Sequence, residues 1–305
     1  MRKTDLLIIV TVFVCIILSV LFPDTFIIFS DYVIYLLMFF VFLSFLGVEI
    51  KVGLKLFSSN YLRFSWLIFL KLILYPILVF LVFKIFLPKY SNSVLLLAGV
   101  STGVVAPFIG LIVGAELTTI LVMVVITTLL VPFTLPFVLK LLTKSDIVIS
   151  FFDMVKTLTI IVFVPVFIAI MTKKFSQKLT EFFLAKRFIF SLVSLALINL
   201  GVFSKYSNFF NQNPKLIIEC IFISLILGFF NLTAGYFAPI FREKEFRLAF
   251  AISFVNINNV LIIVFSSKFF GPVEATLAAM YMLPFFLVIL PLRYLQNSHA
   301  TLWHK

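Results

Sequence analysis

Residues 94–116 read VLLLAGVSTGVVAPFIGLIVGAE, a run that is long and apolar enough to cross a membrane but unsuited to one continuous helix. Gly99, Gly103 and Pro107 all lie within it. Pro107 lacks a backbone donor and its ring clashes with the carbonyl one turn earlier, so the helix should break near Val104–Pro107. For Pro107 taken alone, the alternative to a broken helix is a simple kink. A spanning helix that is interrupted within the membrane is typical of a secondary transporter's binding site.

A second apolar run, residues 248–270, reads LAFAISFVNINNVLIIVFSSKFF and carries three asparagines near its middle. The side chains of Asn256, Asn258 and Asn259 are costly at membrane depth unless they find hydrogen-bond partners. For this run taken alone, the alternative is that the three asparagines form hydrogen bonds to neighbouring helices. The two runs occupy matching places in the two halves of the chain. This correspondence favours two broken helices whose free backbone N–H and C=O groups form a binding site.

The composition indicates a helical membrane protein that spans many times. Of 305 residues, 63% are hydrophobic and 12% are charged, and the mean hydropathy is +1.26. Soluble domains are about half apolar and a quarter charged, and the long unbroken apolar runs argue against a disordered chain or a membrane β-barrel. The net charge of +12 comes from Lys and Arg scattered over short loops. It indicates orientation in a bilayer and not a nucleic-acid partner.

Ten candidate spans follow from the apolar runs. They are Leu6–Phe22, Tyr32–Val48, Phe64–Leu87, Val94–Gly114, Thr118–Leu142, Thr157–Met171, Phe188–Phe203, Leu216–Ile240, Leu248–Phe270 and Val273–Leu292. The sixth is short, and it either begins earlier or follows an interfacial helix in SDIVISFFDMVK. The first lacks a cleavage site before Pro23, so we interpret it as a retained helix. Most Lys and Arg residues lie in loops on the same side of the membrane as the two termini, and cytoplasmic loops are the ones rich in Lys and Arg. We therefore expect a multi-pass protein of the cell (inner or plasma) membrane with both termini in the cytoplasm.

The chain echoes itself at half its length. FLGV at 45–48 recurs as NLGV at 199–202, and VPF at 131–133 recurs as LPF at 283–285. These echoes pair the second span with the seventh and the fifth with the tenth. Because five spans per copy is an odd number, the second copy must be inverted in the bilayer. We therefore predict two inverted five-helix repeats, residues 1–146 and 147–305.

Three stretches resemble the bile acid:sodium symporter family. They are MFFVFLSFLGVEIKVGLKLF at 38–57, STGVVAPFIGLIVGAELTTILVMVVITTLLVPFTLP at 101–136 and FVNINNVLIIVFSSKFFGP at 254–272. The resemblance implies an all-α protein with a panel domain of helices 1, 2, 6 and 7 and a core domain of helices 3–5 and 8–10, in which broken helices 4 and 9 cross. It also implies transport of organic anions by alternating access, often with sodium. The auxin efflux carriers share this architecture, and an exporter of that kind is the near alternative.

The family's sodium-binding residues are mostly replaced here. The family has a Ser-Asn pair in helix 4 and a Glu followed by Gln-Asn in helix 9. The matching positions are Ala106, Pro107, Ser253, Ile257 and Asn258. Lys71 stands where the family has a sodium-binding Gln. The resemblance therefore implies degraded sodium sites, with Lys71 either supplying a fixed or protonatable charge or snorkelling to the surface.

We predict a substrate site between core and panel for a small organic anion with an apolar body. The candidate substrate-binding residues are Val104, Ala106, Pro107, Phe108, Asn258 and Asn259. The candidate residues for ion binding or coupling are Lys71, Ser253 and Asn256. No acidic residue falls at a predicted membrane midplane, which favours proton coupling or ion-independent transport over sodium coupling.

Other classes of membrane protein remain as alternatives. Both histidines, His299 and His304, lie in the C-terminal tail, and the sequence has no HExxH, GxSxG or P-loop motif. We therefore expect no enzyme, no catalytic residues, no metal site and no cofactor. A channel or a non-transporting membrane protein is the remaining alternative, and saturable solute uptake would exclude both.

Overall fold

The computed structural model describes residues 3–143, 150–239 and 242–297, and these residues form helices with one isolated β-bridge and no strand. The first half contains α1 (Lys3–Leu21), α2 (Pro23–Phe26), the 3-10 helix η1 (Ile27–Tyr32), α3 (Val33–Leu46), α4 (Ile50–Ser59), α5 (Tyr61–Phe69), the π-helical η2 (Leu70–Leu74), α6 (Tyr75–Phe86), the 3-10 helix η3 (Pro88–Tyr90), α7 (Ser91–Gly99), α8 (Ala106–Ile112) and α9 (Leu117–Leu142). Helices predominate because a membrane-spanning helix satisfies its backbone hydrogen bonds internally.

The second half is equally helical in its described part. It contains α10 (Phe151–Phe175), α11 (Gln177–Ala185), α12 (Arg187–Ser204), α13 (Ser207–Gln212), α14 (Leu216–Phe237), α15 (Lys244–Val255), α16 (Asn259–Phe269), α17 (Pro272–Met280), α18 (Met282–Leu287) and α19 (Ile289–Asn297). Ser150 caps α10 by accepting a hydrogen bond from the Asp153 N–H at 3.4 Å, and Ser176 caps α11 in the same way.

The described chain contains seven helices that are long and apolar enough to cross a membrane. They are Pro23–Leu46, Tyr61–Phe86, Leu117–Leu142, Phe151–Phe175, Arg187–Ser204, Leu216–Phe237 and Pro272–Leu292. The expected first span is α1, whose apolar part Leu6–Leu21 is shorter. The expected fourth and ninth spans are divided into halves, so neither forms one long helix.

One expected span, the sixth, differs from the structure in its boundaries. The sixth begins at Phe151, so residues 151–156 are the first turns of α10 and not a separate interfacial helix, while residues 144–149 of that lead-in lie outside the described residues. The tenth, expected over Val273–Leu292, agrees with the candidate span Pro272–Leu292, in which single turn residues at Tyr281 and Val288 divide the helix into α17, α18 and α19. Pro284 contributes to this division because proline cannot donate a backbone hydrogen bond.

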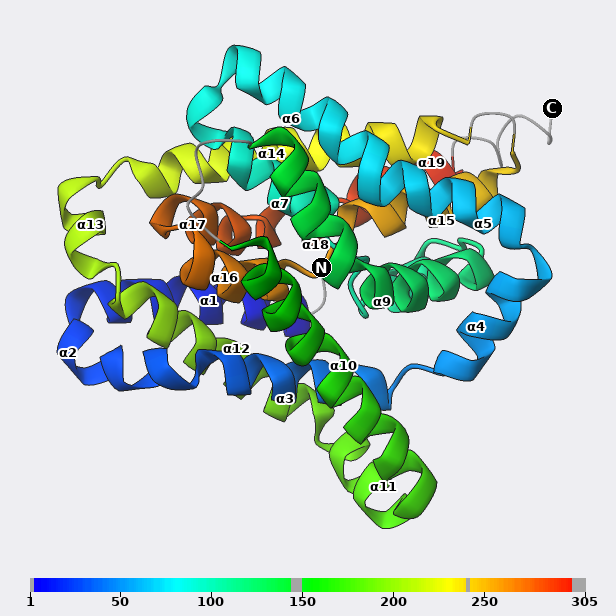
Figure 1. Cartoon of the computed structure of the whole chain (residues 1–305), viewed down its shortest axis with the longest axis horizontal. Helices are drawn as coiled ribbons and strands as arrows, with labels where there is room; N and C mark the ends of the chain where they lie inside the picture. Colours follow the sequence, from blue (N-terminus) through cyan, green and yellow to red (C-terminus); the bar gives the residue numbers. More distant parts are fainter. Residues whose placement is uncertain (1–2, 144–149, 240–241, 298–305) are drawn as a thin grey trace.

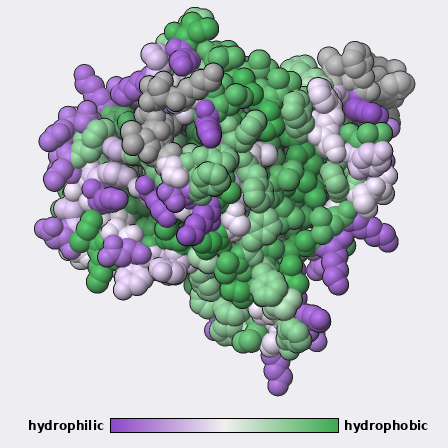
Figure 2. All heavy atoms as spheres, in the orientation of Figure 1, coloured by the Kyte–Doolittle hydropathy of each residue, from purple (hydrophilic) through white to green (hydrophobic). Residues whose placement is uncertain are grey.

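The outer surface is largely apolar, as a lipid environment requires. Ile85 and Phe86 are each 75% exposed, and Phe152 is 78% exposed. Figure 2 shows apolar side chains over much of the visible face, with hydrophilic ones gathered towards its left and right sides. Exposed apolar surface of this extent is typical of a protein in a bilayer.

The helices pack in two groups. One group consists of α1, α3, α10 and α12, in which α12 packs against α1 and α3, and α3 packs against α10 (Figure 1). The other is built around α6, α7, α9, α14, α15 and α17. Contacts of α16 with α3 and α12, and of α10 with α9, join the groups. The first group contains the four helices that the resemblance implies for a panel, and the division into functional domains stays a prediction.

Candidate functional site

Both interrupted helices are present, and their interruptions lie against each other. The fourth span is non-helical between Gly99 and Ala106, and the ninth is non-helical between Val255 and Asn259. The two open segments pair as a short antiparallel bridge between Thr102 and Ile257. The Gly103 N–H donates to the Asn256 carbonyl at 2.7 Å, and the Asn258 N–H donates to the Ser101 carbonyl at 2.9 Å. Each break thus satisfies backbone groups that the other leaves free.

The first break lies earlier than its predicted position of Val104–Pro107. The backbone leaves the helix after Gly99, and Ala106 already begins α8. Pro107 lies in the first turn of α8. At that position a proline's missing N–H would have no partner within the helix, so Pro107 is compatible with the start of the new helix.

Hydrogen bonds to neighbouring helices hold this crossing in place, and we call it the crossover (residues 100–105 and 256–258). The Thr102 hydroxyl donates to the Ser253 carbonyl at 2.9 Å, and the Thr102 N–H donates to the Thr127 hydroxyl at 3.0 Å. The Asn256 amide donates to the Phe285 carbonyl at 2.9 Å. These bonds connect the crossover to α9, α15 and α18 within the buried part of the protein.

Gly103 allows the two backbones to approach. A Cβ atom at this position would lie 2.8 Å from the Ile257 carbonyl oxygen and 3.1 Å from that of Asn256. We expect Gly103→Ala to separate the crossing segments and to destabilise the protein by about 1–3 kcal/mol. Thermal unfolding in detergent measures this loss. The control is Gly271→Ala, because the nearest atom to a Cβ there is 3.8 Å away. Equal melting temperatures for the two variants would contradict the expectation.

A cavity of about 480 Å³ lies beside the crossover. Val104, Val105 and Phe108 line it at the start of α8, and Asn259 and Val260 line it at the start of α16. The opposite wall comes from α1, α3 and the α11–α12 region, with Ile8, Phe40, Ser44, Leu184, Ala185, Arg187, Phe188, Ser191, Leu192 and Leu195. Met282, Phe285 and Phe286 of α18 complete the lining. Its volume and its mostly apolar wall suit a small organic molecule.

The predicted substrate residues do not all reach this cavity. Val104, Phe108 and Asn259 line it, whereas Ala106 and Pro107 are not among its lining residues. Ala106 is fully buried. The structure thus brings one predicted polar side chain, that of Asn259, to the cavity wall.

Asn258 has a local structural role. Its side-chain oxygen accepts a hydrogen bond from the Leu261 N–H at 3.3 Å, which caps α16. The neighbouring Asn259 is 6% exposed, and its amide donates to the Ala278 carbonyl at 3.4 Å. Of the two asparagines, Asn259 lines the cavity and Asn258 does not.

Arg187 is a cavity residue that sequence reasoning missed. It begins α12, and its guanidinium occupies the space left by Gly47, where a Cβ would lie only 2.2 Å from Arg187 Nη1. Nearby, Lys173 Nζ is 3.9 Å from Glu49 Oε1. Among the described residues, no acidic side chain forms an ion pair with Arg187. The cavity therefore presents an unneutralised positive charge beside an apolar wall.

Lys71 is buried inside the core of the protein. It lies in the π-helical segment η2, is 1% exposed, and places its Nζ 5.0 Å from the centre of the Phe254 ring on α15. Its side chain therefore does not reach the surface, which disfavours snorkelling. Within the described part of the chain, the Lys71 ammonium forms no hydrogen bond. The aromatic ring compensates the buried charge only in part.

Of the other two candidate coupling residues, Asn256 belongs to the crossover and Ser253 lies in the last turn of α15, just before it. The Ser253 hydroxyl donates to the Ala249 carbonyl at 2.8 Å, within α15. Asn256 Oδ1 and Ser101 Oγ are buried and find no partner among the residues that the structure describes. Such unsatisfied oxygens are suited to a water molecule or a weakly held cation. No carboxylate belongs to the crossover segments.

A buried polar network next to Lys71 was not foreseen. The Tyr75 hydroxyl donates to the Asn231 side-chain oxygen, and the Asn231 amide donates to the Tyr281 hydroxyl. The Tyr75 ring packs against Phe254 with 5.0 Å between ring centres. This network links α6, α14 and the α17–α18 junction around the ring that faces Lys71. No short sequence motif predicts this network, because Tyr75, Asn231 and Tyr281 are far apart in the sequence.

These features define a multi-pass helical membrane protein with two broken helices that meet beside a cavity. A model of the sodium bile acid symporter family matches residues 34–213, which is more than half of the chain. The chain belongs to this family, whose members are transporters. No curated protein matches the chain. The matched region ends before α14, so the correspondence of α15 and α16 with a broken helix rests on the structure.

Proposed function

We propose that this protein is a secondary active transporter that moves a small organic anion across the membrane by alternating access. The observation that carries the proposal is the composition of the cavity. Its walls combine the starts of α8 and α16, next to the two breaks, with α3 and α12 of the other helix group. A molecule bound there would contact both groups, so relative movement of the groups would change its exposure to the two sides of the membrane.

The chemistry of the cavity favours an anion with an apolar body. Phe40, Phe108 and Phe285 offer apolar surface, whereas Arg187 offers a planar fork of donors that fits a carboxylate or sulfonate. Asn259 can add one hydrogen bond at the opposite wall. Only one cation lines the cavity among the described residues, which favours a monovalent anion over a polyanion.

Two inverted repeats, residues 1–146 and 147–305, would supply the symmetry for alternating access. The helices α1, α3, α10 and α12 would form the panel, and the helices around the crossover would form the core. The crossover supports this division because its hydrogen bonds join core helices to one another. We place the protein in the cell membrane with both termini in the cytoplasm, on the strength of the Lys and Arg distribution.

Coupling to sodium is not part of the proposal. Sodium binding requires several oxygen ligands, usually with a carboxylate, and the crossover segments contain no acidic residue. A buried lysine stands in the third span, where it can supply the single positive charge that sodium would otherwise bring. We therefore propose proton-coupled or ion-independent transport.

The proposal is tested by uptake of labelled cholate, a monovalent apolar-bodied anion, into proteoliposomes that contain the purified protein. We expect saturable uptake that an excess of unlabelled cholate abolishes. Current that rises in proportion to voltage without saturation would indicate a channel. Binding without uptake would indicate a non-transporting protein.

Asn259 should contribute to solute binding. If Asn259→Ala leaves a polar group of the bound solute without a partner, affinity should fall by about 1–3 kcal/mol, which corresponds to about 5–150-fold in KM. The KM for cholate uptake measures the effect. The control is Asn208→Ala, because Asn208 is exposed on α13, away from the cavity. An unchanged KM in Asn259→Ala would remove this amide from the site.

A further inference from the structure

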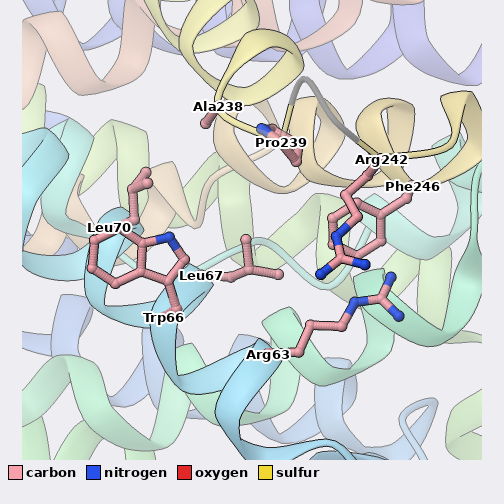
Figure 3. Close-up of a pocket in the computed structure, with 8 residues that line it drawn as sticks. All are labelled: Arg63, Trp66, Leu67, Leu70, Ala238, Pro239, Arg242 and Phe246. Atoms are coloured by element: carbon pink, nitrogen blue, oxygen red, sulfur yellow. The ribbon is translucent and has the colours of Figure 1, made fainter.

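A second cavity, of about 350 Å³, lies outside the proposed transport site. It is formed by the start of the third span, the end of α14 and the start of α15. Figure 3 shows Arg63 and Arg242 converging on it, with Trp66, Leu70, Pro239 and Phe246 around them. The cavity therefore combines two guanidinium groups with an apolar wall.

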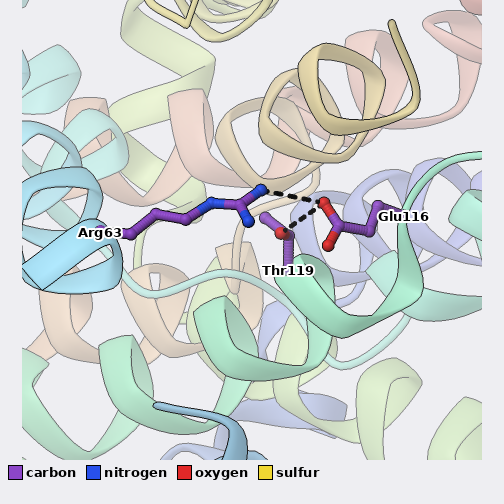
Figure 4. A network of polar contacts seen from close by, with 3 residues as sticks. All are labelled: Arg63, Glu116 and Thr119. Atoms are coloured by element: carbon purple, nitrogen blue, oxygen red, sulfur yellow. Dashed lines mark hydrogen bonds and ion pairs between the residues drawn. The ribbon is translucent and has the colours of Figure 1, made fainter. Parts of the chain in front are cut away.

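The positive charge of this cavity is only partly neutralised. Arg63 Nη2 is 3.3 Å from Glu116 Oε2, and the Thr119 hydroxyl donates to the same oxygen at 3.0 Å (Figure 4). That single carboxylate is the acid paired with Arg63, and no ion pair of Arg242 occurs within the described ranges. Two neighbouring guanidinium groups, of which only one is paired with an acid, attract a further anion.

Arg63 also has unused hydrogen-bonding capacity. Its Nε is buried and has no hydrogen-bond partner among the described residues. The guanidinium is fixed in place, because its carbon lies 4.0 Å from the centre of the Phe246 ring and its Nη2 is held by Glu116. An oriented donor without an acceptor, next to a second guanidinium, is a suitable partner for a phosphate oxygen.

The apolar wall belongs to the surface that faces lipid. Trp66 is 57% exposed and Phe69 is 46% exposed, and both lie on α5 within the candidate span Tyr61–Phe86. Tryptophan is enriched where membrane proteins meet the interface between lipid and water. The cavity therefore lies where a headgroup and the start of an acyl chain can be bound together.

We propose that this cavity binds an anionic phospholipid, with the headgroup phosphate held by Arg63 and Arg242 and an acyl chain lying along Trp66 and Leu70. Basic pockets between membrane helices are suited to such headgroups. Free phosphate could make the same contacts to Arg63 and Arg242, but it would leave the apolar wall of the cavity uncovered. A phospholipid covers both parts of the cavity, so we favour a lipid headgroup as the source of the phosphate.

A bound lipid would strengthen connections among three segments. Arg63 lies on α5, its partner Glu116 immediately precedes α9, and the Glu116 N–H donates to the Glu245 carbonyl at the start of α15 at 3.0 Å. A lipid phosphate on Arg63 and Arg242 adds a link between α5 and the segment that leads into α15. Lipid binding should therefore raise the thermal stability of the whole protein.

The test measures binding and melting temperature of the full-length protein in detergent, with added dioleoylphosphatidylglycerol, dioleoylphosphatidylcholine or inorganic phosphate. The wild type should bind phosphatidylglycerol and melt at a higher temperature with it, while the other two additives should have little effect. Arg242→Gln should weaken phosphatidylglycerol binding about tenfold or more. Lys55→Gln is the matched control, because Lys55 is an exposed cation on α4 outside the cavity.

Each outcome bears on the proposal. Equal phosphatidylglycerol affinity in wild type and Arg242→Gln overturns it, as does equal weakening in Lys55→Gln. An equal temperature shift with phosphatidylcholine would show that charge is not recognised, and an equal shift with inorganic phosphate would show that the ligand is free phosphate; either result overturns the lipid site. Arg242→Lys keeps the charge and should retain part of the affinity, which separates loss of the site from loss of the fold.

Discussion

Arg187→Gln should lower Vmax/KM for cholate uptake by about 10–100-fold, because the bound anion loses a charge-assisted pair of hydrogen bonds in a largely apolar cavity. The guanidinium lines the cavity and has no acidic partner among the described side chains, so its charge is available to the solute. Removing it should leave a bound carboxylate facing an apolar wall, which is unfavourable. The measurement is the initial rate of labelled cholate uptake into proteoliposomes across a range of concentrations.

Two further variants distinguish the effect of the position of the Arg187 guanidinium from the effect of removing a positive charge. Lys186→Gln removes the same charge one residue earlier, on an exposed side chain outside the cavity lining, and should transport normally. Gly47→Ala keeps Arg187 but introduces a Cβ that would lie 2.2 Å from its Nη1, so it should displace the guanidinium and raise KM. Normal kinetics in Arg187→Gln, or equal losses in Arg187→Gln and Lys186→Gln, would exclude Arg187 as the anion-binding group.

Transport should persist when choline replaces sodium, and it should depend on Lys71. The lysine is buried against Phe254, which follows the candidate coupling residue Ser253 on α15, and it stands where the family resemblance implies a sodium ligand. Lys71→Gln removes this charge from the core and should reduce sodium-free uptake at least tenfold. If Lys71 exchanges a proton during transport, an inward proton gradient should accelerate uptake in the wild type but not in Lys71→Gln.

A stability measurement distinguishes a functional lysine from a structural one. An incompletely compensated buried charge destabilises the folded state, so Lys71→Met, which keeps the length and apolar stem, should melt at the same or a higher temperature than the wild type. Reduced transport together with unchanged or increased stability would support a role in transport. A strict sodium requirement in the wild type, or normal sodium-free uptake in Lys71→Gln, would contradict the coupling proposal.

The sequence was sufficient to predict where the two membrane helices break, because the cause is local. One apolar run has asparagines in its middle, and the other contains a proline and glycines. These residues disfavour a continuous helix regardless of the helices against which the run packs. The exact start of the first break was wrong by several residues. Pro107 tolerates a position in the first turn of α8, and the segment from Val100 to Val105 is held open by Asn256 and Thr127, which are distant in the sequence.

The candidate site was only partly predictable, because which side chain faces a cavity depends on packing between distant helices. Asn258 and Asn259 are adjacent and identical in type, but Asn258 lies in the non-helical crossover and caps α16, whereas Asn259 is the first residue of α16 and lines the cavity. Arg187 was counted as a loop charge, since its sequence neighbourhood LAKRF gives no indication of the space that Gly47 leaves for it. The burial of Lys71 against Phe254 likewise depends on the contact between the third span and α15.

The most direct test of the central claim, that the cavity beside the crossover is the substrate site of a transporter, is substrate protection of a cysteine placed in its wall. Ser191 lines the cavity on α12, and both native cysteines, Cys15 and Cys220, are buried. Ser191→Cys should react with a maleimide, and cholate should slow that reaction with half-maximal protection near the KM for uptake. A labelling rate that stays constant at cholate concentrations that saturate uptake would contradict the assignment of the cavity as the substrate site.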